Sequence, residues 1–184
     1  LGAEVDLSDG MIIAKGDLKG ALIDFERSSV GATGNALMAA VTAHGKTVIK
    51  NAAREPEIGA LCIFLKKMGA EIIGVGTDEI TIYGKQQLKA DVDYTVIPDR
   101  IEAGTFLIAG AITNGDITVE NIEPNHLIII SKCLNDAGFK LDFKQNAIRI
   151  QSSGNSIRPV DITTAIYPGF PTDLQAQWMA LMTK

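Results

Sequence analysis

The sequence predicts an α/β (α+β) protein in which helices pack against sheets and one helix–strand unit is repeated. Helix-type and strand-type segments alternate along the chain, which is typical of this class. The segment 34–83 can also be laid over the segment 104–151, so that Gly45 falls on Gly115 and Asn51 on Asn121 at an offset of 70 residues. Similarity to itself at a fixed period indicates a repeated architecture.

Each copy is predicted to contain a helix, a strand, a second helix and a two-stranded hairpin. In the first copy, Ser28 and Ser29 are good N-cap residues for a helix rich in alanine, which we expect to end at Gly45. The β-branched residues 47–49 then predict a strand.

The second helix of the first copy has clear start and stop signals. Pro56 lies in the first turn with acidic neighbours, and Lys66 and Lys67 precede Gly69 at the end. Residues 72–83 then predict a hairpin with a short glycine-containing turn. The helix has an apolar stripe at helical spacing, formed by Ile58, Leu61, Leu65 and Met68.

The second copy repeats these features and locates a domain boundary. Its stripe is Leu127, Ile130, Leu134 and Ala137, and its hairpin turns near 144–146. Between the copies, the segment 90–98 alternates polar and apolar residues and stops at Pro98, which suits an extended crossover. We therefore predict two parts, 1–97 and 98–184.

Both ends of the chain resemble parts of further copies. Gly2-Ala3-Glu4-Val5 matches Gly69-Ala70-Glu71-Ile72, so residues 1–16 look like the tail of an earlier copy. Residues 172–184 look like the opening helix of a later copy. We therefore expect this chain to be a piece of a larger protein.

Composition excludes several classes of function. The chain of 184 residues is 46% hydrophobic, enough for a core, and its net charge of −5 argues against a nucleic-acid partner. Its longest apolar runs are too short to span a membrane. Cys62 and Cys133 lie in apolar helical segments without a CxxC motif, so we expect reduced thiols and a cytoplasmic location. His44 and His126 look isolated and exposed, and no zinc-type spacing is present.

Four short segments place polar groups in unusual positions. In the first, Arg27 and Ser29-Val30-Gly31 occupy a helix start, where free N–H groups and the helix dipole favour a phosphate. The alternative is a capped helix with a glycine for tight packing. In the second, Arg54-Glu55-Pro56-Glu57 follows a strand. These acids could contact a ligand or simply compensate the helix dipole.

The third and fourth segments lie after the crossover. Asp99-Arg100-Ile101-Glu102 forms a charge cluster that could line a cleft or be a solvated linker. The loop 167–171 contains two prolines and a glycine and delivers Thr172 and Asp173 to a helix start. These two residues could be an ordinary cap, but a rigid loop presenting one carboxylate is also how a general base is held.

Together these segments resemble the UDP-N-acetylglucosamine enolpyruvyl transferases. The resemblance implies an inverted α/β architecture of two barrel-like domains, each built from three helix–strand units, with the active site between them. Residues 1–97 would belong to the first, catalytic domain and 98–184 to the second. The matching strings occur in family order and are Ser29-Val30-Gly31-Ala32-Thr33, Asn51-Ala52-Ala53-Arg54-Glu55-Pro56-Glu57, Pro98-Asp99-Arg100-Ile101-Glu102-Ala103-Gly104-Thr105 and Phe170-Pro171-Thr172-Asp173-Leu174-Gln175-Ala176-Gln177.

The resemblance also implies roles. Asp173 would take the proton from the sugar 3′-hydroxyl, and the substrates would be UDP-N-acetylglucosamine and phosphoenolpyruvate, with no cofactor and no metal. Many relatives have lysine where this chain has Arg27, which changes the donor geometry. The loop that carries the general acid has no match in this chain, so we expect the chain alone to be inactive. The implied substrate-binding residues are Arg27, Ser29, Val30, Gly31, Glu55, Arg100 and Thr172.

Two alternatives stay open. One is another enzyme of the same architecture, such as enolpyruvylshikimate-phosphate synthase or RNA terminal-phosphate cyclase. The pairing of Ser-Val-Gly-Ala-Thr with Phe-Pro-Thr-Asp-Leu-Gln favours the sugar-nucleotide branch. The other is a non-catalytic binding module that keeps the fold. The oligomeric state has no signal in the sequence.

Overall fold

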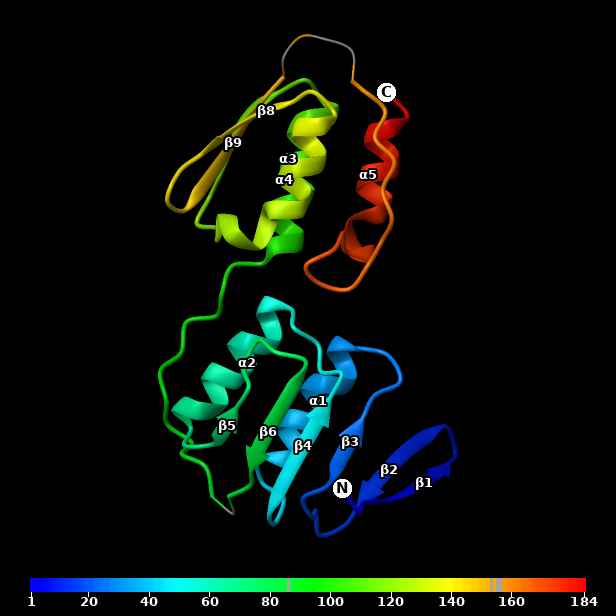
Figure 1. The fold of residues 1–184 in the computed structure, drawn as a ribbon, viewed down its shortest axis with the longest axis vertical. Coiled ribbons are helices and arrows are strands. Elements are labelled where there is room, and N and C mark those ends of the chain that lie inside the picture. Colours follow the sequence, from blue (N-terminus) through cyan, green and yellow to red (C-terminus); the bar gives the residue numbers. More distant parts are fainter. Residues whose placement is uncertain (86, 153, 155–156) are drawn as a thin grey trace. The chain divides into compact units, whose positions relative to one another are not determined.

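The protein divides into two compact units, Leu1–Thr95 and Val96–Lys184, each with its own core. A computed structural model describes residues 1–184 except 86, 153, 155 and 156 (Figure 1). The first unit ends at Thr95, close to the boundary expected near residue 98. The assignment of the two parts to particular domains of a larger enzyme stays a prediction.

The first unit contains a separate hairpin and a four-stranded sheet with two helices. The sheet has the order β3-β4-β6-β5, in which β3 runs parallel to β4 and the other neighbours are antiparallel. The elements are β1 (Glu4–Ser8), β2 (Met11–Lys15), β3 (Leu22–Asp24), α1 (Val30–Ala40), β4 (Lys46–Lys50), α2 (Pro56–Lys67), β5 (Glu71–Ile73) and β6 (Glu79–Tyr83).

The helix α1 ends at Ala40, so the predicted end at Gly45 is wrong. The N–H of His44 donates to the carbonyl of Leu18 at 2.8 Å instead of continuing the helix. Gly45 follows with a φ of +97° and turns the chain into β4. His44 is exposed, as expected, but it is not isolated, because its Nε2 lies 3.3 Å from Asp17 Oδ1. By contrast α2 ends as predicted, next to Gly69 at a φ of +101°.

The core of the first unit lies between the helices and one face of the sheet. Alternate residues of β4 and β6 face the helices, as the period of two along a strand requires. Thr47, Ile49, Ile80 and Ile82 are fully buried on this face. Leu37 of α1 and Cys62 of α2 cover them and are themselves fully buried.

The second unit repeats this plan with one strand fewer. Its sheet has the order β7-β9-β8 and is antiparallel throughout. His126, on the 3-10 helix η1, is half-buried rather than exposed. The elements are α3 (Arg100–Ile112), β7 (Asp116–Glu120), η1 (Pro124–Leu127), α4 (Ile128–Asp136), β8 (Lys140–Phe143), β9 (Ala147–Gln151), η2 (Thr172–Leu174) and α5 (Gln175–Met182).

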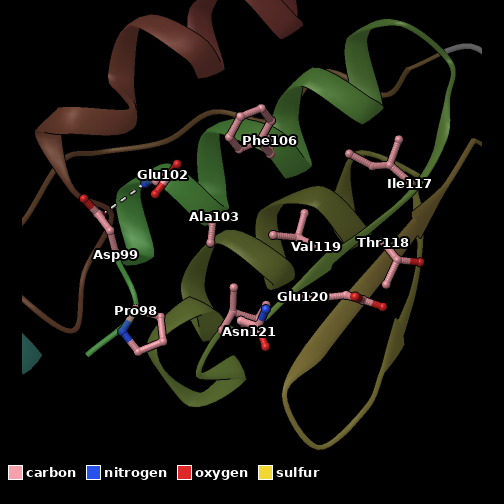
Figure 2. A pocket seen from close by; sticks show the side chains of 11 residues that line it. Pro98, Asp99, Glu102, Ala103, Phe106, Ile117, Thr118, Val119, Glu120 and Asn121 are labelled. Carbon is pink, nitrogen blue, oxygen red and sulfur yellow. Dashed lines mark hydrogen bonds between the residues drawn. The ribbon is translucent and has the colours of Figure 1, made fainter. Parts of the chain in front are cut away.

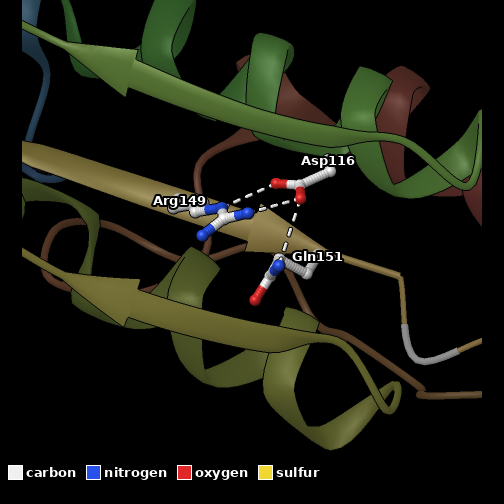
Figure 3. Close-up of polar contacts among 3 residues, drawn as sticks. All are labelled: Asp116, Arg149 and Gln151. Atoms are coloured by element: carbon white, nitrogen blue, oxygen red, sulfur yellow. Dashed lines mark hydrogen bonds and ion pairs between the residues drawn. The ribbon is translucent and has the colours of Figure 1, made fainter.

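An ion pair joins β7 to β9 on the exposed face of the second sheet (Figure 3). Arg149 donates to both oxygens of Asp116, at 2.7 and 2.5 Å, and Gln151 donates to Oδ2 at 3.1 Å. The hydrogen bonds from Arg149 and then Gln151 lower the pKa of Asp116 from 3.8 to about 2. The carboxylate therefore stays ionised at ordinary pH.

This pKa predicts how the stability of the second unit depends on pH. A lowered pKa in the folded state stabilises above the unfolded value of 3.8 and loses that effect as the pH falls through about 2. Asp116→Asn should therefore be less stable than the parent chain at neutral pH, and the gap should close near pH 2. Urea unfolding at both pH values measures this. A gap that is the same at both would contradict it.

A second prediction concerns the contact between α3 and its sheet. A Cβ at Gly110 would lie 2.7 Å from Ile117 Cγ1 and 3.0 Å from Ile150 Cγ2. Gly110→Ala should therefore overpack the core and lower the free energy of unfolding by about 1–3 kcal/mol. The control is Gly59→Ala in α2, where a Cβ meets nothing within 4 Å. Removing this helical glycine should raise stability by up to about 1 kcal/mol. Equal effects in denaturant unfolding would refute the packing explanation.

Candidate functional site

The start of α1 is an open surface with exposed backbone. Ser29 caps the helix, and its Oγ accepts from the N–H of Ala32 at 3.3 Å. Arg27, Ser29, Val30 and Gly31 are all exposed. A Cβ at Gly31 would meet nothing within 4 Å. The tight-packing explanation of this glycine is therefore wrong, and the helix start has room for a ligand.

A buried hydrogen bond joins this helix to the loop after β4. Thr33 is fully buried, and its Oγ1 accepts from the N–H of Ala53 at 3.0 Å. Ala53 belongs to the second matching string and is also buried. The bond therefore brings together two strings that are separated in the sequence.

Asn51 anchors a third segment to the same place. Its backbone is in the left-handed region, with a φ of +51°. Its Nδ2 donates to the carbonyl of Phe25 at 2.8 Å and to Asp24 Oδ1 at 3.2 Å. Residues 24 and 25 lead directly to Arg27, so this clamp fixes the approach of the Arg27 segment. Sequence reasoning missed this role of Asn51, although its match with Asn121 in the repeat was a signal.

Glu55 is a buried carboxylate at the start of α2. It is only 9% exposed, makes no capping hydrogen bond with its side chain, and its Oε2 has no partner among the described residues. A buried carboxylate oxygen without a donor is costly. Dipole compensation at an exposed helix end does not account for such burial.

The remaining predicted site residues lie in the second unit. Asp99 caps the helix, with Oδ1 accepting from Ile101 N at 2.7 Å and from Glu102 N at 3.1 Å. The third string is therefore a helix start, and the solvated-linker alternative is wrong. The Arg100 guanidinium lies 5.6 Å from the centre of the Tyr167 ring. This contact holds the 167–171 loop beside α3.

Thr172 and Asp173 are exposed at the end of that loop. No side chain caps η2 or α5, so the ordinary-cap explanation is wrong. The next residue, Leu174, is fully buried and packs on Gly104, where a Cβ would approach it to 2.7 Å. Gln177 donates to Thr105 Oγ1 at 3.0 Å. These contacts from the third and fourth strings anchor the base of Asp173 and leave its carboxylate in solvent.

A pocket of about 480 Å³ in the same unit does not coincide with these groups (Figure 2). It lies between α3 and β7, and its walls include Asp99, Glu102 and Glu120 but not Arg100, Thr172 or Asp173. Three carboxylates repel anionic phosphates. We therefore place the candidate chemistry at Arg100 and Asp173 and not in this pocket.

Neither cysteine is suited to nucleophilic chemistry. Burial raises the pKa of Cys62 to about 11, and it also raises the pKa of Cys133. A thiol with a raised pKa carries little thiolate at neutral pH. Within the described part of the chain, no group of three or more potential ligands could hold a metal ion. No described helix is long and apolar enough to cross a membrane.

Comparison with known proteins gives a family and close relatives. The family described as EPSP synthase (3-phosphoshikimate 1-carboxyvinyltransferase) matches residues 1–184. The UDP-N-acetylglucosamine 1-carboxyvinyltransferase of Chlorobaculum parvum is 56% identical over 187 residues, covering 100% of this chain and 44% of its own length. The enzyme of the same name from Campylobacter hominis is 50% identical over 98% of this chain and 43% of its own length. The chain thus spans less than half the length of these relatives.

Solved structures support the fold. The enolpyruvyl transferase NikO from Streptomyces tendae matches with a TM-score of 0.88 at 23% identity, over 98% of this chain and 46% of its own. EPSP synthase from Acinetobacter baumannii matches with a TM-score of 0.59 at 20% identity, over 83% of this chain and 37% of its own. The expected enolpyruvyl transferase fold is confirmed.

The bond between Thr33 and Ala53 yields a direct prediction. Thr33→Val keeps the shape but leaves the buried N–H of Ala53 without an acceptor, which should cost about 1–3 kcal/mol of stability. Thr33→Ser retains the hydroxyl and should cost less. Denaturant unfolding measures both, and amide exchange at Ala53 should speed up only in the valine variant. Unchanged exchange at Ala53 in the valine variant would show that the bond does not hold the loop.

Proposed function

Because the chain belongs to the EPSP synthase (3-phosphoshikimate 1-carboxyvinyltransferase) family, we propose that it is part of an enzyme that transfers enolpyruvyl from phosphoenolpyruvate to the 3′-hydroxyl of UDP-N-acetylglucosamine. Phosphate is the second product. Relatives at 50–56% identity that bear the corresponding name support this acceptor. The product would enter peptidoglycan synthesis in the cytoplasm and so serve cell-wall growth, cell shape and division.

The first unit would bind the nucleotide diphosphate. Free N–H groups at the start of α1 and the helix dipole favour an anion there. Exposed Gly31 allows the diphosphate to approach the backbone, and Arg27 can add a charged, forked donor. Ser29 and Val30 line the same helix start. Glu55, at the start of α2, would contribute its carboxylate to the sugar site.

The second unit would supply the general base. Asp173 takes the proton from the 3′-hydroxyl as the hydroxyl oxygen forms a bond to C2 of phosphoenolpyruvate. The methylene carbon of phosphoenolpyruvate is protonated in the same addition, which gives a tetrahedral phospho-ketal. Loss of a proton from the methyl carbon and cleavage of the C–O bond to phosphate then leave the enolpyruvyl ether. Arg100 and Thr172 would frame the reacting groups, and the acid comes from outside this chain.

The proposed role of Asp173 rests on the exposure of its carboxylate. Its carboxylate is exposed and caps no helix, while Leu174 beside it is fully buried. A carboxylate that caps no helix, on a backbone held in place by a buried neighbour, is well placed to act as a base.

The experiment that tests the activity measures phosphate release from phosphoenolpyruvate by a longer protein that carries this chain. Release should require UDP-N-acetylglucosamine. A second candidate acceptor is shikimate 3-phosphate, favoured by the name of the matching family. Release that needs shikimate 3-phosphate instead would select that alternative.

The chain of 184 residues on its own should have no transferase activity. It spans 43–44% of its relatives, and catalytic groups that act as a unit fail together when part is missing. The measurement is phosphate release by chain prepared free of host enzyme, with the longer protein as positive control. Turnover by the purified chain would contradict the assignment of the acid to another part of the protein.

In the longer protein, Asp173→Asn should lower turnover by at least about 10²-fold, the low end for a general base. The amide is nearly isosteric but cannot take the proton, so the melting temperature should stay unchanged. Asp136→Asn is the matched control, because Asp136 is exposed on α4 outside the four strings. Near-normal turnover of Asp173→Asn would remove Asp173 from the mechanism.

A further inference from the structure

The segment that carries Arg27 is anchored two residues before it. Phe25 follows β3, and its N–H donates to the carbonyl of Lys50 at 3.3 Å. Its own carbonyl accepts from Asn51 Nδ2 at 2.8 Å, and its side chain packs against the core of the first unit. Both backbone groups of Phe25 are therefore held by two consecutive residues where β4 ends, and only Glu26 lies between this anchor and Arg27.

The same loop also anchors the chain after Arg27. Ser29 caps α1, and its carbonyl accepts from the N–H of Thr33 at 2.9 Å. The hydroxyl of Thr33 in turn accepts from the N–H of Ala53 at 3.0 Å. Asn51 and Ala53 therefore hold the chain on the two sides of Arg27, which is itself exposed.

The backbone of Asn51 is shared with its repeat counterpart, but the anchor is not. Asn51 has a φ of +51°, in the left-handed region that asparagine adopts more readily than most residues. Its amide also donates to Asp24 Oδ1 at 3.2 Å. Asn121 has a φ of +57° but lies in the wall of the pocket between α3 and β7. The two asparagines therefore separate the effect of the backbone from that of the side-chain amide.

We propose that Asn51 is a positioning residue for the diphosphate of the sugar nucleotide, which rests on the function proposed above for Arg27 and the start of α1. Asn51 acts through Phe25 and holds the Arg27 segment in its binding conformation before the ligand arrives. A segment that is already ordered loses less conformational entropy on binding, so the affinity is higher.

This role has a kinetic signature. The diphosphate takes no part in the bonds that form or break in the transfer, so its binding stabilises the ground state and the transition state equally. Loss of such uniform binding raises KM and leaves kcat unchanged. Asn51 therefore affects KM, in contrast to Asp173, whose loss lowers kcat.

The test uses the longer protein that carries this chain, with calorimetry of uridine diphosphate binding and phosphate release with UDP-N-acetylglucosamine. Asn51→Gly keeps the left-handed backbone, because glycine adopts a positive φ readily, and removes the amide donor. It should raise the Kd of uridine diphosphate and the KM of the sugar nucleotide by about three- to tenfold, the effect of an ordinary hydrogen bond. The kcat should change by less than about twofold. Asn121→Gly is the matched control and should leave all three constants unchanged.

A pair of charge variants separates positioning from a general loss of stability. Asn51→Asp cannot donate to Phe25 and places a second carboxylate beside Asp24, so it should raise the Kd more than Asn51→Gly does. Adding Asp24→Asn restores a donor and an acceptor between the two positions, with their roles exchanged. The double variant should recover part of the lost affinity, while Asp24→Asn alone should bind no more tightly than the parent.

The proposal is overturned if Asn51→Gly binds uridine diphosphate as tightly as Asn121→Gly does, or if its kcat falls while KM is unchanged. It is also overturned if the double variant binds no better than Asn51→Asp alone. If the melting temperature shows that Asn51→Gly does not fold, the comparison of Asn51→Asp with the double variant decides. A parent protein that does not bind uridine diphosphate at all would overturn the proposed function and this inference together.

Discussion

The nucleotide-binding surface proposed here depends on one buried hydrogen bond, from the N–H of Ala53 to Thr33 Oγ1. Thr33 is fully buried, so neither group can exchange its partner for water. The bond fixes the start of α1 against the loop that leads to Glu55. Asn51, two residues before Ala53, binds the segment before Arg27 in the same way. Three segments that are distant in the sequence therefore share one rigid base.

The second unit uses the same scaffold with different local contacts. Ala103 stands where Thr33 stands in the first unit, so no hydroxyl is available for the corresponding bond. Instead, the Tyr167 ring lies under Arg100, Leu174 packs on Gly104, and Gln177 binds Thr105. A repeated fold can thus carry a diphosphate-binding surface in one copy and an exposed carboxylate in another, since the differences lie in a few side chains.

Much of the fold could be predicted from the sequence because its signals are local. The signals that act over a few residues are the apolar stripes, the proline at the start of α2 and the glycine-containing turns. They predicted both helix pairs and both hairpins in the right order. The end of α1 could not be predicted in this way. After Ala40 the chain leaves the helix, and the N–H of His44 donates to the carbonyl of Leu18, a partner 26 positions earlier in the chain.

The candidate site could likewise be predicted from the sequence only in part. Resemblance to a family indicated which residues to examine, and their exposure or burial could be seen only in the structure. In the sequence, Thr33 looks like one more residue of an apolar helix, because its hydrogen-bond partner, Ala53, is 20 positions away. The burial of Glu55 is likewise set by elements packed around it and not by its neighbours in the chain. Asn51 alone carried a signal, through its repetition as Asn121, and both residues adopt a positive φ.

An NMR titration of this chain with uridine diphosphate tests directly whether the start of α1 and the loop after β4 form one binding surface. The amide shifts should change together at the start of α1, around residues 29–33, and in the loop around residues 53–55. The same titration of Thr33→Val should show the loop shifts uncoupled from those of the helix. Shifts that are absent from both segments, or that occur instead around the pocket between α3 and β7, would contradict it.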